Sequence, residues 1–463
     1  METPLYTALT DYQKKKYASF HTPGHKNTIS FLKYNLYDLD FTELPDTDSL
    51  FEAEGCILKA EQTAAKAFST LLCVLSAGGC TMCIQGMLRL AAPSGGKLVC
   101  GRIIHRSAVN TMALLGIDPV WVMPEPNAGE GLAGRITPEG VRRALEKNPE
   151  AKGVYLTSPD YYGVICDIQG IACVCKKYGV PLLVDNAHGA HLGYLSENLH
   201  PIHLGASMAA CSAHKTLPVL TGGAWLQIND SRYLEGVKEA MSLFGSTSPS
   251  YLILQSLDAC NRLLSTDYPA RLQECCDRLA VLRARLNALA AAQGTALPLA
   301  LDSPAREPMK LTLDAATLGL TGQALADYLR QNGMECEYAD PRYLVLMFTP
   351  ENPAEDIARL EAALAELCAR GIPPAEPPAE HREAFCALAR QAEPRLTVRQ
   401  AVFAPQETIP AGSALGRVCA LPTVSCPPAI PIVVSGEVIG PAALELFTAY
   451  GVETVSVVKS EKF

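Results

Sequence analysis

The sequence lacks several features that would assign it to a broad class at once. No window holds the roughly eighteen uninterrupted apolar residues of a membrane span. The N-terminal segment METPLYTALTDYQKKKYASF has no apolar core of a signal peptide. Basic residues are not in excess, since 39 Lys and Arg stand against 48 Asp and Glu, and no basic stripe is present. We therefore expect a cytoplasmic protein with no membrane and no nucleic acid partner.

A metal-binding cysteine framework is also missing. The CxxC motif from Cys80 to Cys83 has no second pair at zinc-finger spacing. Most of the 17 cysteines lie in apolar runs, as Cys73 and Cys211 do, where a free cysteine behaves as a small hydrophobe. We expect these cysteines to pack in the core and predict no metal site.

What the chain does have is length and a regular alternation of apolar segments. With 463 residues, 48% of them hydrophobic, it can bury a large core in two or three domains. From about residue 50 to 250 short apolar runs alternate with longer amphipathic ones. We predict helices over 53–70 and 137–147, the second with Thr137 as N-cap and Glu139 in its first turn. Strands are predicted at 98–100, 119–123, 153–157, 181–185 and 208–211. This order indicates an α/β protein with a mostly parallel sheet covered on both faces.

The second half of the chain is organised differently. Residues 250–295 are Leu- and Ala-rich and favour one or two long helices. Strands at 311–314 and 343–348 around a helix at 321–333 indicate a smaller α+β unit, 370–381 is a Pro-rich linker, and 428–440 contains a strand bounded by turns. The predicted domains are an N-terminal arm (1–45), a large domain (46–295), a small α+β domain (296–375) and a C-terminal domain (382–463).

Polar side chains follow three of the predicted strands. Ser158 and its neighbours to 163 follow the strand at 153–157, Asp185 and His188 follow the next, and Ser212, His214 and Lys215 follow the third. Ligands of open α/β sheets bind beyond the carboxyl ends of the strands. We therefore expect these side chains at one site.

Lys215 and Asp185 together indicate pyridoxal 5′-phosphate (PLP) chemistry. A lysine that forms an imine with an aldehyde needs access to its neutral form, and Lys215 lies in a run with few charges. A buried carboxylate such as Asp185 keeps the pyridine nitrogen of PLP protonated. The alternatives are a surface lysine beside a histidine and a helix-capping acid.

Eight segments then carry a resemblance that covers nearly the whole chain. They are FHTPGHK (20–26), FTELPDTDSL (41–50), RIIHRSA (102–108), LTSPDYYG (156–163), VDNAHGAHLGY (184–194), CSAHKTL (211–217), STSPSY (246–251) and CPPAIPIVVSGE (426–437). In this order they resemble the Orn/Lys/Arg decarboxylase family of fold-type I PLP enzymes, in the compact form without an N-terminal wing domain.

The resemblance implies a role for each matching residue. Lys215 would hold PLP as an imine, Asp185 would pair with the pyridine nitrogen, and His105 would stack on the ring. His188 would lie near the ring oxygen or the substrate carboxylate, so that the implied catalytic set is Lys215, His105 and His188. The other implied cofactor-binding residues are Gly78, Gly79, Cys80, Thr81, Ser158, Ser212 and His214, with Ser246 or Thr247 from a neighbouring subunit.

Some positions depart from the family pattern. The phosphate loop usually reads NGST and here is Ala77 to Thr81, so the usual hydroxyl is lost or comes from Thr81. Backbone N–H groups at a helix N-terminus can still bind phosphate. Asp160, Asn186, Gly222-Gly223 and Ser425-Cys426 also differ from the pattern. These changes bear on substrate choice more than on cofactor binding.

The implied reaction is decarboxylation of a basic amino acid, arginine, lysine or ornithine, to an amine and carbon dioxide. Its distal cation would need acidic partners, for which Glu335, Glu337 and Asp340 are candidates, with Asp46 and Asp48 from a partner subunit. The alternative for the first three is a charged turn before a strand. The resemblance also implies a homodimer or a higher multiple with shared sites.

Two other functions stay open at this point. Another fold-type I activity, such as an aminotransferase, aldolase or carbon–sulfur lyase, would keep Lys215 and Asp185 unchanged. A catalytically silent PLP-binding protein is the second, because the phosphate loop is unusual.

Overall fold

A seven-stranded sheet forms the centre of the computed structural model, which describes residues 4–26, 36–125, 134–295, 297–370, 394–425 and 431–459 together with 384, 387 and 388. Its strands lie in the order β2-β8-β7-β6-β5-β3-β4. They are β2 (Leu72–Ser76), β3 (Gly96–Gly101), β4 (Ile117–Val122), β5 (Val154–Thr157), β6 (Leu182–Asp185), β7 (Met208–Cys211) and β8 (Ala224–Ile228). Within the sheet β8 runs antiparallel to both neighbours, and the other pairs are parallel.

The mostly parallel sheet confirms the predicted fold class. The five predicted strands are β3 to β7, within one to two residues at their ends. The sequence analysis missed β2 and β8. All five residues of β8 are buried, as are four of the five residues of β2.

Both faces of the sheet are covered by helices, and successive strand residues point to opposite faces. The helices flanking the sheet are α2 (Cys56–Ala67), α3 (Gly79–Ala91), α4 (Arg106–Leu115), α5 (Pro138–Lys147), α6 (Ile168–Tyr178) and α8 (Val237–Ser242). One hydrophobic cluster contains Leu98, Tyr155 and Leu183 on the face that packs against α3 and α4. The opposite cluster contains Val99 and Val184 and packs against α5 and α6. The helices predicted at 53–70 and 137–147 are thereby confirmed as α2 and α5.

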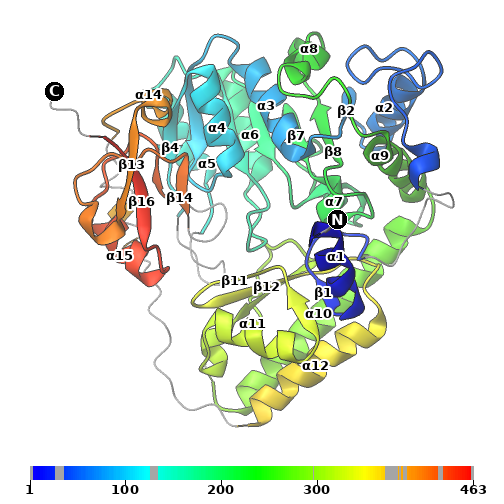
Figure 1. The fold of residues 1–463 in the computed structure, drawn as a ribbon, viewed down its shortest axis with the longest axis vertical. Coiled ribbons are helices and arrows are strands. Elements are labelled where there is room, and N and C mark those ends of the chain that lie inside the picture. Colours follow the sequence, from blue (N-terminus) through cyan, green and yellow to red (C-terminus); the bar gives the residue numbers. More distant parts are fainter. Residues whose placement is uncertain are drawn as a thin grey trace.

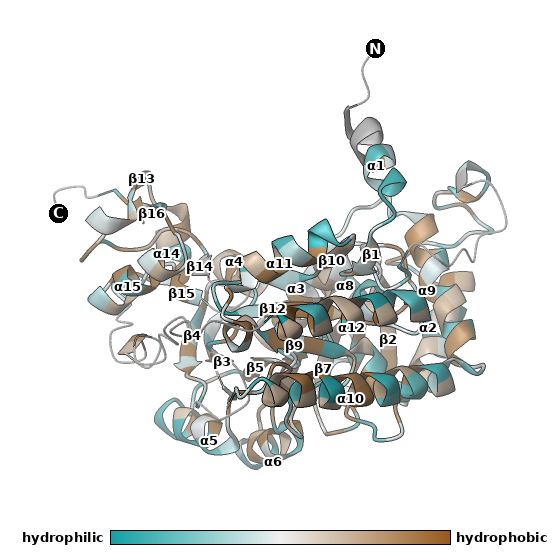
Figure 2. Ribbon diagram, turned by 90° about the horizontal axis from the view of Figure 1, so that it is seen from below, coloured by the Kyte–Doolittle hydropathy of each residue, from teal (hydrophilic) through white to brown (hydrophobic). Residues whose placement is uncertain are grey.

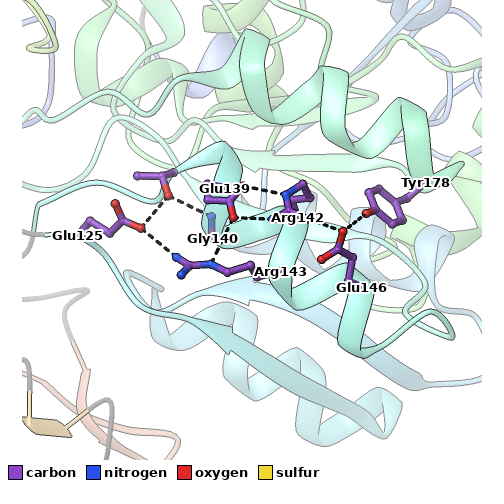
Figure 3. Close-up of polar contacts among 8 residues, drawn as sticks. Glu125, Glu139, Gly140, Arg142, Arg143, Glu146 and Tyr178 are labelled. Carbon is purple, nitrogen blue, oxygen red and sulfur yellow. Dashed lines mark hydrogen bonds and ion pairs between the residues drawn. The ribbon is translucent and has the colours of Figure 1, made fainter.

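Helix α5 begins as the sequence predicts. The Thr137 hydroxyl accepts a hydrogen bond from the Gly140 N–H at 3.1 Å. On the solvent side Arg142 pairs with Glu139 one turn before it and Glu146 one turn after it (Figure 3). Exposed pairs at this spacing contribute little to stability and mark a solvated face that takes no part in the site described below.

The second half of the chain forms long helices and a small sheet. Helices α9 (Tyr251–Leu264) and α10 (Tyr268–Ala292) confirm the helical stretch predicted at 250–295. Helix α12 (Ala354–Ala369), which the sequence analysis did not predict, lies beside α10 (Figures 1 and 2). The predicted strands and helix are β9 (Lys310–Asp314), β12 (Tyr343–Met347) and α11 (Gly322–Gln331); β12 pairs with β9 and with β11 (Tyr338–Ala339). The Pro-rich linker at 370–381 lies outside the described residues except for residue 370.

The N-terminal arm is attached to this small unit. After α1 (Pro4–Lys14), β1 (Ala18–Phe20) pairs in parallel with β10 (Met334–Cys336), and a 3-10 turn follows at Leu36–Leu39. The Gly24 N–H donates to the His214 carbonyl at 2.8 Å. A Cβ on Gly24 would lie 2.6 Å from the Leu217 carbonyl oxygen, so glycine is required for this approach. The arm therefore contacts the segment that carries Lys215.

The C-terminal segment packs beside the sheet. Its elements are α14 (Val398–Phe403), β13 (Gln406–Pro410), β14 (Thr423–Ser425), β15 (Pro431–Val434), α15 (Pro441–Ala449) and β16 (Thr454–Val458), and β15 is the strand predicted within 428–440. Its hydrophobic cluster takes in Ile103, Tyr162 and Tyr343 from the other units. Because the core clusters cross the expected boundaries, the four-domain division stays a prediction. None of the described helices combines the length and the apolar character needed to cross a membrane.

Candidate active site

The carboxyl ends of β5, β6 and β7 open into one cavity. These adjacent parallel strands end at Thr157, Asp185 and Cys211. The cavity has a volume of ≈ 390 Å³. It is lined by Gly79, Cys80, Thr81, Ile84, His105, Ser107, Thr157, Tyr161, Asp185, Ala187, His188, Ser212, His214, Lys215 and Glu337. The strand-end argument therefore brings most of the expected residues together.

Lys215 reaches this cavity from the short helix α7 (Ala213–Thr216) that follows β7. Its Nζ lies 3.2 Å from Nε2 of His188. Burial, and then the positive charge of Lys215, hold the pKa of His188 well below its ordinary value. The neutral imidazole can accept a hydrogen bond from the lysine side chain, so it can orient a proton on Nζ.

Asp185 is a buried carboxylate at the end of β6. Its Oδ2 accepts the Tyr155 hydroxyl at 3.3 Å and its Oδ1 accepts the Ala187 N–H at 3.2 Å. The Cys80 thiol lies 3.8 Å from Oδ1, and burial and then Asp185 raise the pKa of that thiol well above its ordinary value. Among the described residues no Lys or Arg forms an ion pair with Asp185. A cationic group of a ligand would therefore find an acceptor here.

His105 lies at the N-cap of α4 and lines the cavity. Its Nδ1 accepts the Ser107 N–H at 3.2 Å, which fixes the ring. Burial lowers the pKa of His105, although Asp185 opposes this effect. A neutral, fixed imidazole can lie against an aromatic ligand.

A polar end of the cavity is formed by the N-terminus of α3. Gly78 is its N-cap residue and makes no side-chain capping bond, and Gly79 takes a φ of +71° and donates its N–H to the Gly222 carbonyl at 2.8 Å. Cys80 and Thr81 follow in the first turn and line the cavity. Such a helix end attracts anions. His214 Nδ1 lies 3.1 Å from the Gly223 carbonyl on the same wall.

Of the three acids of the small unit, the structure brings Glu337 to the cavity. Glu337 accepts the Tyr161 hydroxyl at 2.9 Å and the Thr22 N–H at 2.8 Å. Glu335 instead faces Arg330, with Nε and Oε2 3.5 Å apart. Asp340 is buried outside the cavity lining and accepts hydrogen bonds from Tyr162 and from the backbone N–H of Tyr343.

Four further candidates do not line the cavity of this chain. Asp48 accepts the N–H groups of residues 49, 54, 55 and 57, the last two at 2.8 and 2.9 Å, which makes it a capping residue before α2. Asp46, Ser246 and Thr247 are exposed. Their expected contributions to a partner subunit stay predictions.

Ser158 is buried behind the cavity. Its hydroxyl accepts the Cys166 N–H at 3.1 Å, which holds the loop after β5 rather than the cavity wall.

The sequence analysis gave no role to Tyr161 or to Lys310. Tyr161, one of the residues that follow the strand at 153–157, packs edge-on against His188, with ring centroids 5.1 Å apart. Lys310 is buried beneath it and donates to the carbonyls of Asp160 and Tyr161 at 3.2 and 3.1 Å. Burial lowers the pKa of Lys310 to about 8. No motif in the sequence pointed to this lysine.

Comparison with known structures defines the class of the fold. The chain superposes on the constitutive lysine decarboxylase of Escherichia coli with a TM-score of 0.72 at 20% identity, covering 99% of this chain and 82% of that one. A Sphingomonas wittichii serine palmitoyltransferase matches with a TM-score of 0.57 at 16% identity, over 77% of this chain and 88% of that one. The architecture is that of fold-type I PLP enzymes.

Sequence comparison then gives the family. The model "Orn/Lys/Arg decarboxylase, major domain" matches residues 3–356. An arginine decarboxylase of Bacillus subtilis is 31% identical over 95% of this chain and 91% of its own length. The chain belongs to the Orn/Lys/Arg decarboxylase family and is an amino acid decarboxylase, which confirms the resemblance and the predicted reaction class. The other activities considered above lose their support.

Proposed function

We propose that this enzyme is a PLP-dependent arginine decarboxylase that holds its cofactor on Lys215. The observation that carries the proposal is the convergence of Lys215, His188, His105 and Asp185 on one cavity. Arginine is favoured over lysine because relatives from Bacillus subtilis and Bacillus cereus that match nearly their whole length, at 31% and 29% identity, are named arginine decarboxylases. The Escherichia coli lysine enzyme matches over 57% of this chain and 40% of its own length, at 26% identity.

The cavity fits PLP in its polar groups. Thr157 Oγ1 and His188 Nδ1 are buried and find no hydrogen-bond partner among the residues that the structure describes, and both residues line the cavity. A ligand with ring oxygen and nitrogen atoms would satisfy such groups. The N-terminus of α3, with Thr81, Ser212 and His214, would hold the phosphate, and Asp185 the pyridine nitrogen. PLP, when bound, supplies the electron sink that makes loss of carbon dioxide possible.

The protein side of the chemistry is proton handling and orientation. Lys215 would carry the cofactor through Nζ and give it up to the substrate amine. The neutral Nε2 of His188, 3.2 Å from Nζ, would accept a hydrogen bond from the lysine amine or ammonium and orient it. Once Nζ is free of the cofactor, its proton would replace the carboxylate at the substrate Cα. His105 would lie against one face of the ring and so fix the orientation of the ring in the cavity.

Glu337 would bind the guanidinium of arginine. A guanidinium presents a planar fork of donors that matches a carboxylate, and such charge-assisted bonds are strong when partly buried. Tyr161 and the Thr22 N–H fix the Glu337 carboxylate from two sides. Glu335 and Asp340, which the sequence offered equally, bind other groups of the protein instead.

The proposal includes a homodimer or higher multiple in which Ser246 and Thr247 reach the partner's phosphate site. Both are exposed and lie between α8 and α9. The fifteen described cysteines are free thiols, which suits a reducing compartment, and we place the enzyme in the cytoplasm.

One experiment tests the proposal. The wild-type protein and Lys215→Ala are incubated with PLP, their visible spectra are recorded, and carbon dioxide release is measured with arginine, lysine and ornithine. We expect the band of lysine-bound PLP in the wild type alone, and release from arginine at least ten times faster than from lysine. A protein that stays colourless refutes the cofactor assignment, and faster release from lysine or ornithine refutes the substrate.

A further inference from the structure

The C-terminal segment (described residues 394–425 and 431–459) binds the chain next to both ends of helix α4. Helix α4 (Arg106–Leu115) follows directly after its N-cap residue His105. In Figure 1 the helix α14 of the C-terminal segment lies beside α4, and the two helices are in contact. The orientation of the His105 ring in the cavity depends on where this helix starts.

The first contact is a buried ion pair made by Arg102, three residues before His105. Arg102 Nη1 lies 2.5 Å from Oε1 of Glu437, and Nη2 lies 2.7 Å from Oε2. The two side chains are 3% and 4% exposed. The Arg102 guanidinium also lies 4.9 Å from the centroid of the Trp121 ring. A forked pair of this kind fixes direction as well as distance.

Glu437 is itself held in place by the turn after β15. Its Oε2 accepts the Val434 N–H at 2.8 Å, and its own N–H donates to the Val434 carbonyl at 3.1 Å. Gly436 takes a φ of +92°, and a Cβ there would lie 2.2 Å from the Leu396 carbonyl oxygen. The carboxylate is thus presented to Arg102 by a rigid turn.

The second contact is at the C-terminal end of α4. Arg399, on α14, donates through Nη1 to the carbonyls of Ala113 and Leu114 at 3.1 and 2.8 Å. The last carbonyls of a helix have no partner within it, and a cation there also complements the helix dipole. Arg399 therefore caps α4 from outside.

The two residues between Arg102 and His105 pack in different hydrophobic cores. Ile103 packs in the core of the C-terminal segment, whereas Ile104 packs in the core between the sheet and α4. A displacement of the C-terminal segment would pull on Ile103 and Arg102 together. It would change the start of α4, and with it the place of His105.

We propose that the C-terminal segment serves the active site as a clamp, with Glu437, Arg102 and Arg399 acting as positioning residues for His105. This inference rests on the proposed function, because it takes the His105 ring to lie against the cofactor. None of the three side chains lines the cavity. Their effect is on catalysis through the placement of α4.

The double variant Arg102→Met/Glu437→Leu separates positioning from stability. Removing one partner of a buried pair leaves an uncompensated charge, whereas replacing both by apolar residues is often neutral for stability. We expect a melting temperature close to that of the wild type and a kcat lowered about tenfold to a hundredfold, since a misplacement of about 1 Å can cost that much. A folded double variant with the wild-type kcat would overturn the proposal.

A second readout does not require bound cofactor. Burial lowers the pKa of His105 in the intact chain, with Asp185 opposing. A loosened turn lets water reach the ring, so we expect NMR titration of the cofactor-free double variant to place that pKa nearer its ordinary value. A wild type that binds no PLP would refute the proposed function and leave this test standing. An unchanged His105 titration in the double variant would refute the clamp alone.

Two single variants complete the experiment. Arg399→Met removes the contact at the C-terminal end of α4 and leaves the buried pair of Arg102 and Glu437 in place. We expect a smaller loss of kcat than in the double variant, and a shift of the His105 pKa in the same direction. It also keeps the test valid if the double variant fails to fold: wild-type kcat and titration in Arg399→Met would then overturn the clamp. Arg142→Met, in the exposed network on α5 (Figure 3), is the matched control and is expected to change neither.

Discussion

The phenol hydroxyl of Tyr161 donates a 2.9 Å hydrogen bond to Oε1 of Glu337, across 176 residues of sequence. It joins the loop after β5, which borders His188, to the turn between β10 and β11 in the small unit. The N-terminal arm reaches the same carboxylate through the Thr22 N–H. Three parts of the chain thus meet at the acid proposed to bind the substrate guanidinium.

Replacing this acid should weaken substrate binding. Glu337→Gln removes the charge and keeps the size, and the lost charge-assisted bond corresponds to a KM for arginine raised about tenfold to a hundredfold. Steady-state kinetics measure the effect. Glu335→Gln, two residues away and paired with Arg330, is the matched control and should leave KM unchanged. Equal effects of the two variants would contradict the choice of Glu337.

Tyr161→Phe should raise KM by a smaller factor, about threefold to tenfold, because it removes one neutral donor to a carboxylate that keeps the Thr22 N–H. The same kinetic assay applies. A Tyr161→Phe variant whose KM rises more than that of Glu337→Gln would point to a direct role of the phenol in substrate binding.

The capping role of Asp48 predicts a loss of stability rather than of binding. Its carboxylate accepts several backbone N–H groups before α2, and although desolvation opposes it, these bonds lower the pKa of Asp48. Asp48→Ala should lower the free energy of unfolding by about 1–3 kcal/mol, measured by urea denaturation. Asp46→Ala, on an exposed neighbour, should have no such effect. A raised KM with unchanged stability would instead support the role of Asp48 as a substrate group across a subunit interface.

The close contact between the arm and the segment of Lys215 leaves no room for a side chain at residue 24. Gly24→Ala would place a Cβ 2.6 Å from the Leu217 carbonyl oxygen, and backbone must move to relieve it. We expect a loss of about 1–3 kcal/mol in unfolding free energy together with a reduced kcat. Gly412→Ala is the control, since its Cβ would meet no atom within 4 Å. Wild-type activity in Gly24→Ala would show that the arm does not affect Lys215.

Buried histidines should make the fold sensitive to mild acid. Burial lowers the pKa values of His105, His188 and His214, and that of His200 to about 3. Below about pH 6.5 the histidines of the unfolded chain bind protons, whereas the buried histidines of the folded chain stay neutral. The free energy of unfolding therefore falls as the pH falls below about 6.5. Above about pH 6.5 these histidines do not change the free energy of unfolding.

His200 isolates this effect from catalysis, because it lies outside the cavity lining. Its contribution should approach about 1.4 kcal/mol per pH unit between pH 6 and 4. Urea denaturation of the wild type and His200→Gln over this range measures the slope. A variant with the same slope as the wild type would mean that His200 is protonated in the folded chain.

The sequence by itself determined the local secondary structure and the kinds of side chain that line the cavity at the carboxyl ends of the strands. Continuous apolar runs predicted β5, β6 and β7, in which every residue is buried, because parallel strands between two helix layers do not alternate with polar residues. Thr137 fixed the start of α5 because its hydroxyl accepts a hydrogen bond from the N–H of Gly140, three residues later. Polar residues directly after strands located Asp185, His188 and Lys215, since the ends of adjacent parallel strands necessarily meet.

Only the tertiary structure decided between chemically equal candidates. Glu335, Glu337 and Asp340 are the same kind of group in the sequence, and their partners separate them: Arg330 for the first, Tyr161 and Thr22 for the second, Tyr162 for the third. The pairing of Arg102 with Glu437 and the place of Lys310 under Tyr161 likewise join residues far apart in the chain. Such contacts depend on how separate elements pack, which no local pattern of residues encodes, and they set the orientation of side chains whose chemistry the sequence already specifies.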